Sequence, residues 1–335
     1  GQDKIAASKA VAVTFASWPV SPGPVLGDAF EVLDTSKHGT NFYATVGENV
    51  VVGSGIFNYS ALIIMPSQNG TVVRVDTNAD GSMDLTNTLA QGQSWLVNTN
   101  GGIQAGARVL SSAPVQVHLL TARRNSAYQN RWFTLHPRER WSTGYYSPVA
   151  KTANNDPAAV FLFNAGASAL TVNYQTATAS GSTNVAAGGV TQFLMPTNSG
   201  ARFFTTNGTA FAAVHAMDVP TASTSNNGDD YDWGCSLLPA DALSPTILIG
   251  YGAGSSTLTA NGSPVWAMAV SNATLLIDFD GNPATGPLID GNGRRYNTSV
   301  AALAFRPVRI YDTSGDNSQT GMKVYTTNGV YIAAV

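Results

Sequence analysis

The chain is poor in charged residues, in cysteine and in long apolar runs, and each shortage argues against a class of protein. Only 11% of its 335 residues are Asp, Glu, Lys or Arg, against roughly 25% in ordinary soluble domains. No apolar run approaches the roughly 18 residues that cross a bilayer, so the sequence predicts no transmembrane segment. With a formal net charge of −3, the chain also lacks a basic stripe for phosphates, which argues against nucleic-acid binding.

Cysteines and catalytic motifs are scarce as well. Cys235 is the single cysteine, so no internal disulfide framework can form. The sequence contains neither a Gly-x-Ser-x-Gly elbow nor a His-Glu-x-x-His pair, the motifs that would support nucleophilic or zinc catalysis. We therefore predict that the protein is not an enzyme.

Uncharged polar residues must cover the surface in place of charges. Such surfaces, rich in Thr, Ser, Asn, Gln and Gly, suit sheets better than helices. No stretch sustains a 3.6-residue apolar period, and β-rich runs alternate with clusters of Gly, Asn, Ser and Pro. These patterns predict an all-β fold with less than about a tenth of the residues in helices.

One pattern of strands and turns is written three times, about 100 residues apart, which is typical of internal repeats. Each copy has an apolar strand, a polar turn and a second apolar strand, at 61–75, 160–172 and 265–277. This predicts a repeated β-hairpin. A second landmark, a strand that leads through a hydroxyl-rich turn into a new strand, places His118 and His215 at matching positions of the first two copies.

A third landmark, Leu-x-Pro, follows the first two copies at 135–137 and 237–239 and is missing from the third. The predicted architecture is three tandem β-sandwich-like units of about 100 residues. The expected organisation is an N-terminal arm or first strand at 1–38, repeat 1 at 39–150, repeat 2 at 151–255, and repeat 3, in truncated form, at 256–335. Residue 1 is Gly and not Met, which favours a processed signal peptide and a secreted, cell-surface location, with a residue left by cloning as the alternative.

The sharpest candidate site is the loop at 76–84. Oxygen-bearing side chains stand at its positions one, three, five and nine, namely Asp76, Asn78, Asp80 and Asp84. Alternate side chains can converge on a cation while Gly81, at position six, accepts the sharp turn, as in an EF-hand-type calcium loop; the carbonyl of Ser82 would add a ligand. Asn87 stands where that pattern has a bidentate Glu, so we expect weak calcium affinity. The alternative is an ordinary turn of Asn, Asp and Gly.

A second acidic loop follows the corresponding strand of the third copy. The calcium ligands expected there are Asp278, Asp280, Asn282 and Asp290. Asp290 lies eight positions after Asn282, a spacing that fits no standard calcium loop. The second copy has no acids at this place, so the fold does not require calcium.

Two further clusters have more than one interpretation. Asp229, Asp230 and Asp232 could ligate a metal, serve glycoside hydrolysis, or form a solvated turn. Aromatic residues between 132 and 146 lie among arginines between 123 and 140, and they could bind a carbohydrate ring or a protein partner. The alternative is a packed connection between two sandwiches, with Arg stacked on Trp.

Several of these segments resemble a known family. Gly39-Thr-Asn-Phe-Tyr43, the strand pair at 61–75, the strand-turn-strand at 107–120 and the segment ending in Gly144-Tyr-Tyr-Ser-Pro148 are similar to the IgG Fc-binding protein N-terminal domain. Bacterial versions of that domain lie in large, secreted, repetitive surface proteins. The resemblance covers residues 39–148 directly and the rest through the repeat. It implies a β-rich fold and extracellular adhesion or binding, but not antibody binding, and it transfers no ligand residues.

We carry three hypotheses of function. The first is an extracellular, calcium-stabilised surface protein that acts in adhesion or binding, with a protein or glycan ligand at the cell surface. The second is a subunit of an extracellular fibre that self-associates, because the alternating small and apolar residues at 4–15 could pair with an open sheet edge of the next copy. The third, a polysaccharide-active enzyme, depends on the scattered Asp and aromatic residues.

Overall fold

A computed structural model describes residues 5–9, 11–16, 29–99, 101–124, 130–151, 158–217, 233–252, 264–313 and 316–335. Strands dominate these ranges, and the helices within them are three short 3-10 turns, η1 (Thr35–Lys37), η2 (Arg138–Arg140) and η3 (Ala240–Ala242). No helix in the same ranges is long and apolar enough to cross a membrane. The prediction of an all-β fold is confirmed.

The N-terminal sandwich has two layers that share one long strand. Its strands are β3 (Gly39–Tyr43), β4 (Tyr59–Pro66), β5 (Thr71–Asp76), β6 (Leu85–Leu89), β7 (Trp95–Val97), β8 (Arg108–Ala122) and β9 (Arg131–Thr134). The first residues of β8 pair with β3 and β5, and its later residues pair with β4 and β9. The strand therefore passes from one layer into the other, and a buried apolar core lies between the layers.

The continuity of β8 differs from the sequence expectation of a strand, a hydroxyl-rich turn and a new strand at 107–120. Hydrogen bonds keep the intervening residues extended: the Ser111 hydroxyl donates to the Ala113 carbonyl, and the Ser67 N–H donates to the Pro114 carbonyl. Proline is tolerated there because it stands at the corner between the two layers.

The central sandwich consists of two four-stranded antiparallel sheets. Its strands are β10 (Gly144–Ser147), β11 (Ala158–Phe163), β12 (Leu170–Thr176), β13 (Ser180–Val185), β14 (Val190–Leu194), β15 (Ala201–Phe204), β16 (Ala212–Met217) and β17 (Gly234–Ser236). One sheet has the order β10-β15-β12-β13 and the other β14-β11-β16-β17. Side chains from both sheets form one core.

The C-terminal sandwich pairs a four-stranded sheet with a three-stranded sheet. Its strands are β18 (Thr246–Leu248), β19 (Val265–Ala269), β20 (Ala273–Asp278), β23 (Thr298–Ala302), β24 (Val308–Ile310), β25 (Lys323–Tyr325) and β26 (Ile332–Ala334), with a small hairpin of β21 (Leu288–Ile289) and β22 (Arg295–Tyr296). The sheet orders are β18-β25-β20-β23 and β24-β19-β26.

The predicted hairpins at 61–75, 160–172 and 265–277 are wrong. The strands of each segment follow one another in the sequence but do not pair: β8 separates β4 from β5, and β11 and β12, like β19 and β20, belong to different sheets. The physical reason is burial. Val160 and Leu162 of β11 meet Leu170 and Val172 of β12 face to face in one core, which pairing side by side in one sheet would not allow.

Successive sandwiches pack directly on each other. β11 is buried on both faces: Val160 and Leu162 belong to the central core, while Ala159 and Phe161 belong to the core of the N-terminal sandwich. The Phe161 ring meets the Phe57 ring edge to face, with centroids 5.0 Å apart. One sheet of the central sandwich is thus laid on its N-terminal neighbour.

The second junction is built in the same way. Val265 and Ala267 of β19 face the C-terminal core, whereas Trp266 between them belongs to the central core. Met268, further along the same strand, packs with Phe305 at this junction.

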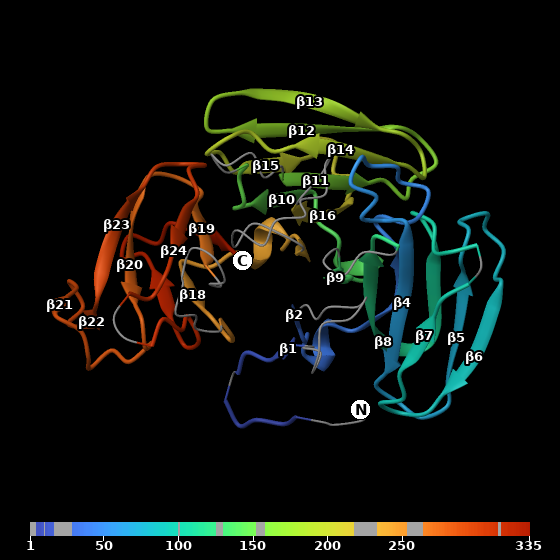
Figure 1. Cartoon of the computed structure of the whole chain (residues 1–335), viewed down its shortest axis with the longest axis horizontal. Helices are drawn as coiled ribbons and strands as arrows, with labels where there is room; N and C mark the ends of the chain where they lie inside the picture. Colours follow the sequence, from blue (N-terminus) through green and yellow to red (C-terminus); the bar gives the residue numbers. More distant parts are fainter. Residues whose placement is uncertain are drawn as a thin grey trace.

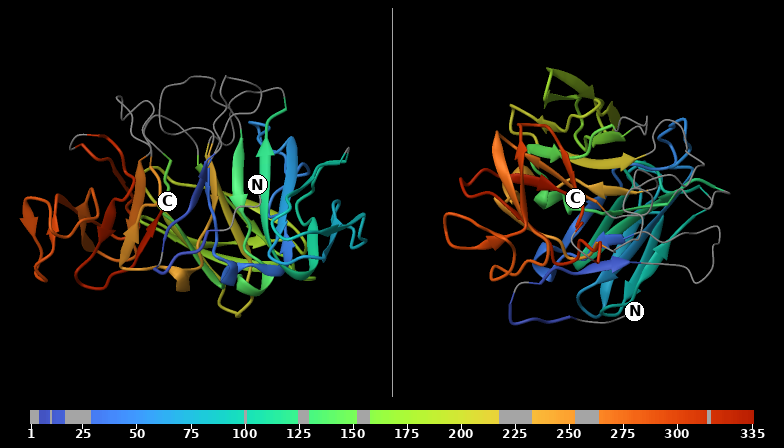
Figure 2. Two further views of the ribbon diagram at one scale, coloured as in Figure 1. Left: turned by 90° about the horizontal axis from the view of Figure 1, so that it is seen from below. Right: turned by 60° about the vertical axis from the view of Figure 1, so that its left-hand side comes forward.

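A two-stranded hairpin, β1 (Thr14–Ala16) and β2 (Ala29–Glu31), covers the outer face of the N-terminal sandwich. Phe30 stacks on Trp132, with ring centroids 5.2 Å apart, and lies 4.0 Å from the His118 ring. Figure 1 shows the three sandwiches arranged around this hairpin, the N-terminal one on the right, the central one at the top and the C-terminal one on the left. The left view of Figure 2 also places the blue hairpin between the two outer sandwiches.

Candidate functional site

The predicted calcium loop at 76–84 connects β5 to β6, and its side chains are held by the loop's own backbone. The two carboxylate oxygens of Asp76, a buried residue, accept N–H bonds from Ala79 at 2.8 Å and from Gly81 at 2.9 Å. Asn78 and Asp80 each accept an N–H from the residue two positions on, at 3.0 and 2.8 Å. The hydrogen bond that the Ser82 N–H donates to the Asp80 carboxylate lowers the pKa of Asp80.

Asp84 closes the same loop from its other end. One of its carboxylate oxygens accepts both the N–H and the hydroxyl of Thr77, at 2.7 and 2.6 Å. Gly81, with φ of 92°, adopts the left-handed backbone that the turn requires. The loop's own bonds leave a lone-pair site on each oxygen of Asp76 but fill both sites of this Asp84 oxygen. Carboxylate oxygens are the ligands that calcium prefers, so Asp76 and Asp80 are the acidic residues of this loop that could contact such an ion.

The second predicted site, after β20, has a buried carboxylate with an unmatched oxygen. Asp278 is 2% exposed, and within the described part of the chain its Oδ1 atom has no hydrogen-bond partner. Burial and the nearby carboxylate of Asp280 raise the pKa of Asp278 to about 6. Asp280 itself accepts the N–H of Asn282 at 3.0 Å and the hydroxyl of Thr285. A cation beside these two carboxylates would offset both the burial and the repulsion, so the residues fit calcium here as well.

Asp290 is engaged elsewhere. One of its carboxylate oxygens accepts N–H bonds from Asn292 and Arg294, and the other accepts the Tyr325 hydroxyl at 3.1 Å. Across the described ranges, no three His, Cys, Asp or Glu side chains are grouped as a metal site would need. The acidic cluster at 229, 230 and 232 falls outside those ranges.

A buried polar cluster lies beneath the N-terminal hairpin. His118 Nε2 is 2.8 Å from the Gln116 amide nitrogen, and His118 Nδ1 is 3.2 Å from the Thr134 hydroxyl. That hydroxyl donates its proton to the Glu31 carbonyl, so Nδ1 of His118 must carry the proton and Nε2 must accept from Gln116. Burial, with a smaller effect of His38, lowers the pKa of His118 to about 3, which keeps the ring neutral.

The predicted equivalence of His118 and His215 is wrong. His118 points away from its own core toward Phe30. His215 points into the central sandwich, where its Nδ1 lies 3.4 Å from the Ser147 hydroxyl and its ring lies beside Trp233. The sequence pattern matched an outward-facing residue of one strand with a core-facing residue of the other. Because successive side chains of a strand point to opposite faces, a register error of one residue is enough to cause this mismatch.

The patch of aromatic and arginine residues lies at the junction between the N-terminal and central sandwiches. Trp141 packs on Tyr43 and Phe163, and the Arg138 guanidinium lies 4.5 Å above the Trp141 ring. Arg131 is fully buried and donates to the Met217 carbonyl. Of the two interpretations of this patch, the geometry favours the packed connection.

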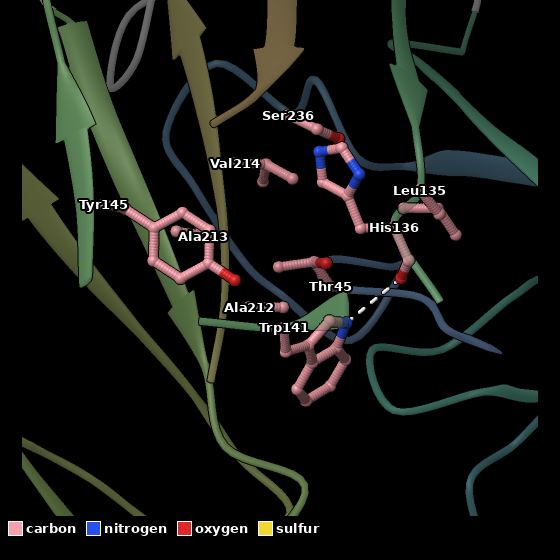
Figure 3. A pocket seen from close by; sticks show the side chains of 9 residues that line it. All are labelled: Thr45, Leu135, His136, Trp141, Tyr145, Ala212, Ala213, Val214 and Ser236. Carbon is pink, nitrogen blue, oxygen red and sulfur yellow. Dashed lines mark hydrogen bonds between the residues drawn. The ribbon is translucent and has the colours of Figure 1, made fainter. Parts of the chain in front are cut away.

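Figure 3 shows the small cavity inside this junction. Its volume is about 10 Å³, which is room for roughly one water molecule. The Trp141 indole N–H donates to the His136 carbonyl at 3.0 Å, and the Ser236 hydroxyl at the cavity has no hydrogen-bond partner among the residues that the structure describes. Burial and the charge of Arg140 lower the pKa of His136 to about 4. A cavity of this size is too small for a substrate.

A larger groove, which the sequence reasoning missed, lies between the N-terminal and central sandwiches. It has a volume of about 330 Å³. Its walls are residues 49–52 and Ala105 on one side, and Phe161 with residues 188–190 and Gln192 on the other. Val51 at this groove is 92% exposed. The run of three valines at 50–52 next to an Asn, outside any predicted strand, was the available signal.

No family model, no curated protein and no solved structure matches this chain. The resemblance to the IgG Fc-binding protein N-terminal domain therefore remains a prediction from the motifs quoted for it.

Proposed function

We propose that the chain is a stack of internal repeats from an extracellular surface protein, which acts in adhesion or binding and is stiffened by calcium. The observation that carries this proposal is the burial of β11 and β19 on both faces, one face in their own core and the other in the preceding sandwich. Units joined in this way cannot move independently, so the array presents fixed, polar outer surfaces to a partner.

The order of the strands supports the interpretation as repeats. The strands of the central sandwich can be numbered in chain order, so that β10 is its first strand and β16 its seventh. One sheet then contains the first, sixth, third and fourth strands, in that order, and the other sheet begins with the fifth, second and seventh. If β21 and β22 are treated as an insertion, the C-terminal sandwich has the same orders. The N-terminal sandwich also agrees when the two parts of β8 are counted as sixth and seventh strands.

A recurring row of side chains supports the same proposal. In each sandwich a cationic residue of the sixth strand stands between a residue of the first strand and a polar residue of the third. The rows are Tyr43-Arg108-Asp76, Tyr146-Arg202-Gln175 and Leu248-Lys323-Asp278. The two aspartates of the predicted calcium sites thus stand at the same place of the first and third units.

Calcium would act at these two loops by neutralising carboxylates at the ends of β5 and β20. Asp76 and Asp80, with Asn78 and the carbonyl of Ser82, would hold one ion, and Asp278, Asp280 and Asn282 would hold another. A ligand that binds only the folded state raises its stability by about 1.4 kcal/mol at a tenfold excess over Kd. We therefore expect a higher melting temperature in millimolar calcium than in excess chelator, and Asp80→Ala and Asp278→Asn should each reduce the difference.

Adhesion is tested with beads that carry the purified chain. Such beads should attach to cell surfaces more than beads that carry albumin, and chelation or the two loop variants should reduce attachment together with the melting temperature. Attachment no greater than that of the albumin beads would refute the adhesion proposal. If attachment does not depend on calcium while the melting temperature does, calcium stiffens the chain but is not needed for binding.

The fibre alternative is favoured by one specific observation. Residues 5–9 and 11 precede β1, belong to no strand or helix, and are exposed, with Ile5 68% and Val11 59% accessible. An exposed segment with apolar side chains can add to an open sheet edge when it takes up an extended conformation. Deletion of residues 1–11 should abolish self-association if this alternative holds.

A further inference from the structure

The edge of the central sandwich at β14 has unused backbone hydrogen-bonding groups. β14 ends the sheet β14-β11-β16-β17 and pairs on one side with β11. The Met195 N–H donates to the Ala158 carbonyl and the Asn164 N–H donates to the Gly189 carbonyl, so the odd-numbered residues of this stretch bond to β11. In an antiparallel ladder the alternate residues point their N–H and C=O groups away from the partner strand. Within the described ranges, the outward groups belong to Val190, Gln192 and Leu194.

The groove of about 330 Å³ lies next to this edge. Gln192 and Val190 line it from the strand, and Val51, which is 92% exposed, lines it from the opposite wall. None of the described residues that line the groove carries a charge. A strand added to β14 would therefore place every second side chain in a space without charge.

We propose that β14 and this groove take up residues 5–11 of a second copy of the chain as an added strand. The proposal rests on the fibre alternative above and names the edge that the segment would occupy. Main-chain hydrogen bonds to Val190, Gln192 and Leu194 would supply the affinity, and the groove would select the side chains.

The chemistry of the segment fits this place. In an extended conformation, Ala6 and Ser8 lie on one face, and Ile5, Lys9 and Val11 lie on the other. The face with small, uncharged side chains would enter the groove between β14 and the valines at 50–52. The opposite face would cover the half-buried side of the central sheet and leave the flexible Lys9 ammonium in solvent.

The proposal is tested with a fluorescent peptide of residues 4–11 and the full chain. Gln192→Pro removes the outward N–H, and it leaves the hydrogen bonds to β11 intact because that N–H does not point to β11. Gln192→Ala is the matched control, because it loses the same side chain but keeps the N–H. We expect Gln192→Pro to weaken peptide binding roughly tenfold and Gln192→Ala to leave it nearly unchanged.

Two further measurements keep the result clear. Val51→Asp, at an exposed position where folding should be unaffected, should weaken the peptide as well, because it places a charge in the groove. Melting curves of each variant check that it is folded. Absence of binding to the wild-type chain, or equal binding to wild type and Gln192→Pro, overturns the proposal.

Light scattering of the full chain separates this proposal from the fibre alternative. If deletion of residues 1–11 leaves self-association unchanged, the fibre alternative itself is wrong, and this proposal with it. If association needs residues 1–11 but is insensitive to Gln192→Pro and Val51→Asp, the segment acts at another edge and the assignment of β14 alone is wrong.

Discussion

His215 should make the central sandwich sensitive to acid, and His215→Gln should remove a defined part of that sensitivity. The imidazole is fully buried in the described structure, with its Nδ1 3.4 Å from the Ser147 hydroxyl and its ring 5.5 Å from that of Trp233. Burial lowers the pKa of His215 to about 3, and the positive charge of Arg131 contributes in the same direction. The folded protein therefore keeps this ring neutral well below neutral pH.

The size of the effect follows from the two pKa values. In the unfolded chain the pKa of this imidazole is 6.5. Below that pH the unfolded state binds a proton that the folded state rejects, so the free energy of unfolding falls as the pH drops from 6.5 and levels off near 3. At pH 5 the loss is about 2 kcal/mol for this one group.

Other groups add to the pH dependence of the whole chain. Burial lowers the pKa of His118 and His136 to about 3 and about 4, so both act in the same direction as His215. Asp278 opposes them, because its raised pKa of about 6 lets the folded state hold a proton as the pH falls. The comparison of a single variant with the wild type isolates His215 from these contributions.

The assay is urea unfolding at pH 7 and at pH 5, followed by tryptophan fluorescence. Between these two pH values, His215→Gln should lose about 2 kcal/mol less stability than the wild type. Ser147→Ala is the control, because it removes the neighbouring hydroxyl and keeps the imidazole, and should retain the wild-type pH dependence. If wild type and His215→Gln lose equal stability, the ring is accessible to protons in the folded state and the reasoning is refuted.

Two substitutions test the junction between the N-terminal and central sandwiches. Phe161→Ala should cost about 3–5 kcal/mol, because the buried ring packs on Phe57 across the junction; a loss below about 1 kcal/mol in urea unfolding would show that the junction is not a packed core. Gly234→Ala should also destabilise, because an added Cβ would lie 2.7 Å from the Phe133 ring, whereas Gly101→Ala, with open space around it, should leave the melting temperature unchanged. Equal melting temperatures for these two alanine variants would contradict the close approach of β17 to β9.

The acidic loops show how far sequence reasoning reached at the candidate sites. The spacing of oxygen-bearing residues located the turn after β5, because the pattern of an Asp, an Asn, an Asp and a Gly is local and specifies a turn whatever surrounds it. It did not indicate that Asp278 is buried with an unmatched oxygen, since burial depends on which strands lie alongside β20. Nor did the sequence show that Asp290 is engaged away from Asp280. The hydrogen bond that holds Asp290 comes from Tyr325, which is far from it in the chain.

The composition and the short apolar runs by themselves determined that the protein is built from strands, because a chain with few charges and no helical period can bury its apolar residues only in sheets. Only the tertiary structure decided which strands pair. Consecutive strands such as β11 and β12 could form a hairpin or face each other across a core, and the two alternatives have the same local pattern. The difference is burial on both faces of β11, which exists only because the N-terminal sandwich covers its outer side. The faces of His118 and His215, the groove at β14 and the junctions all depend on that long-range packing.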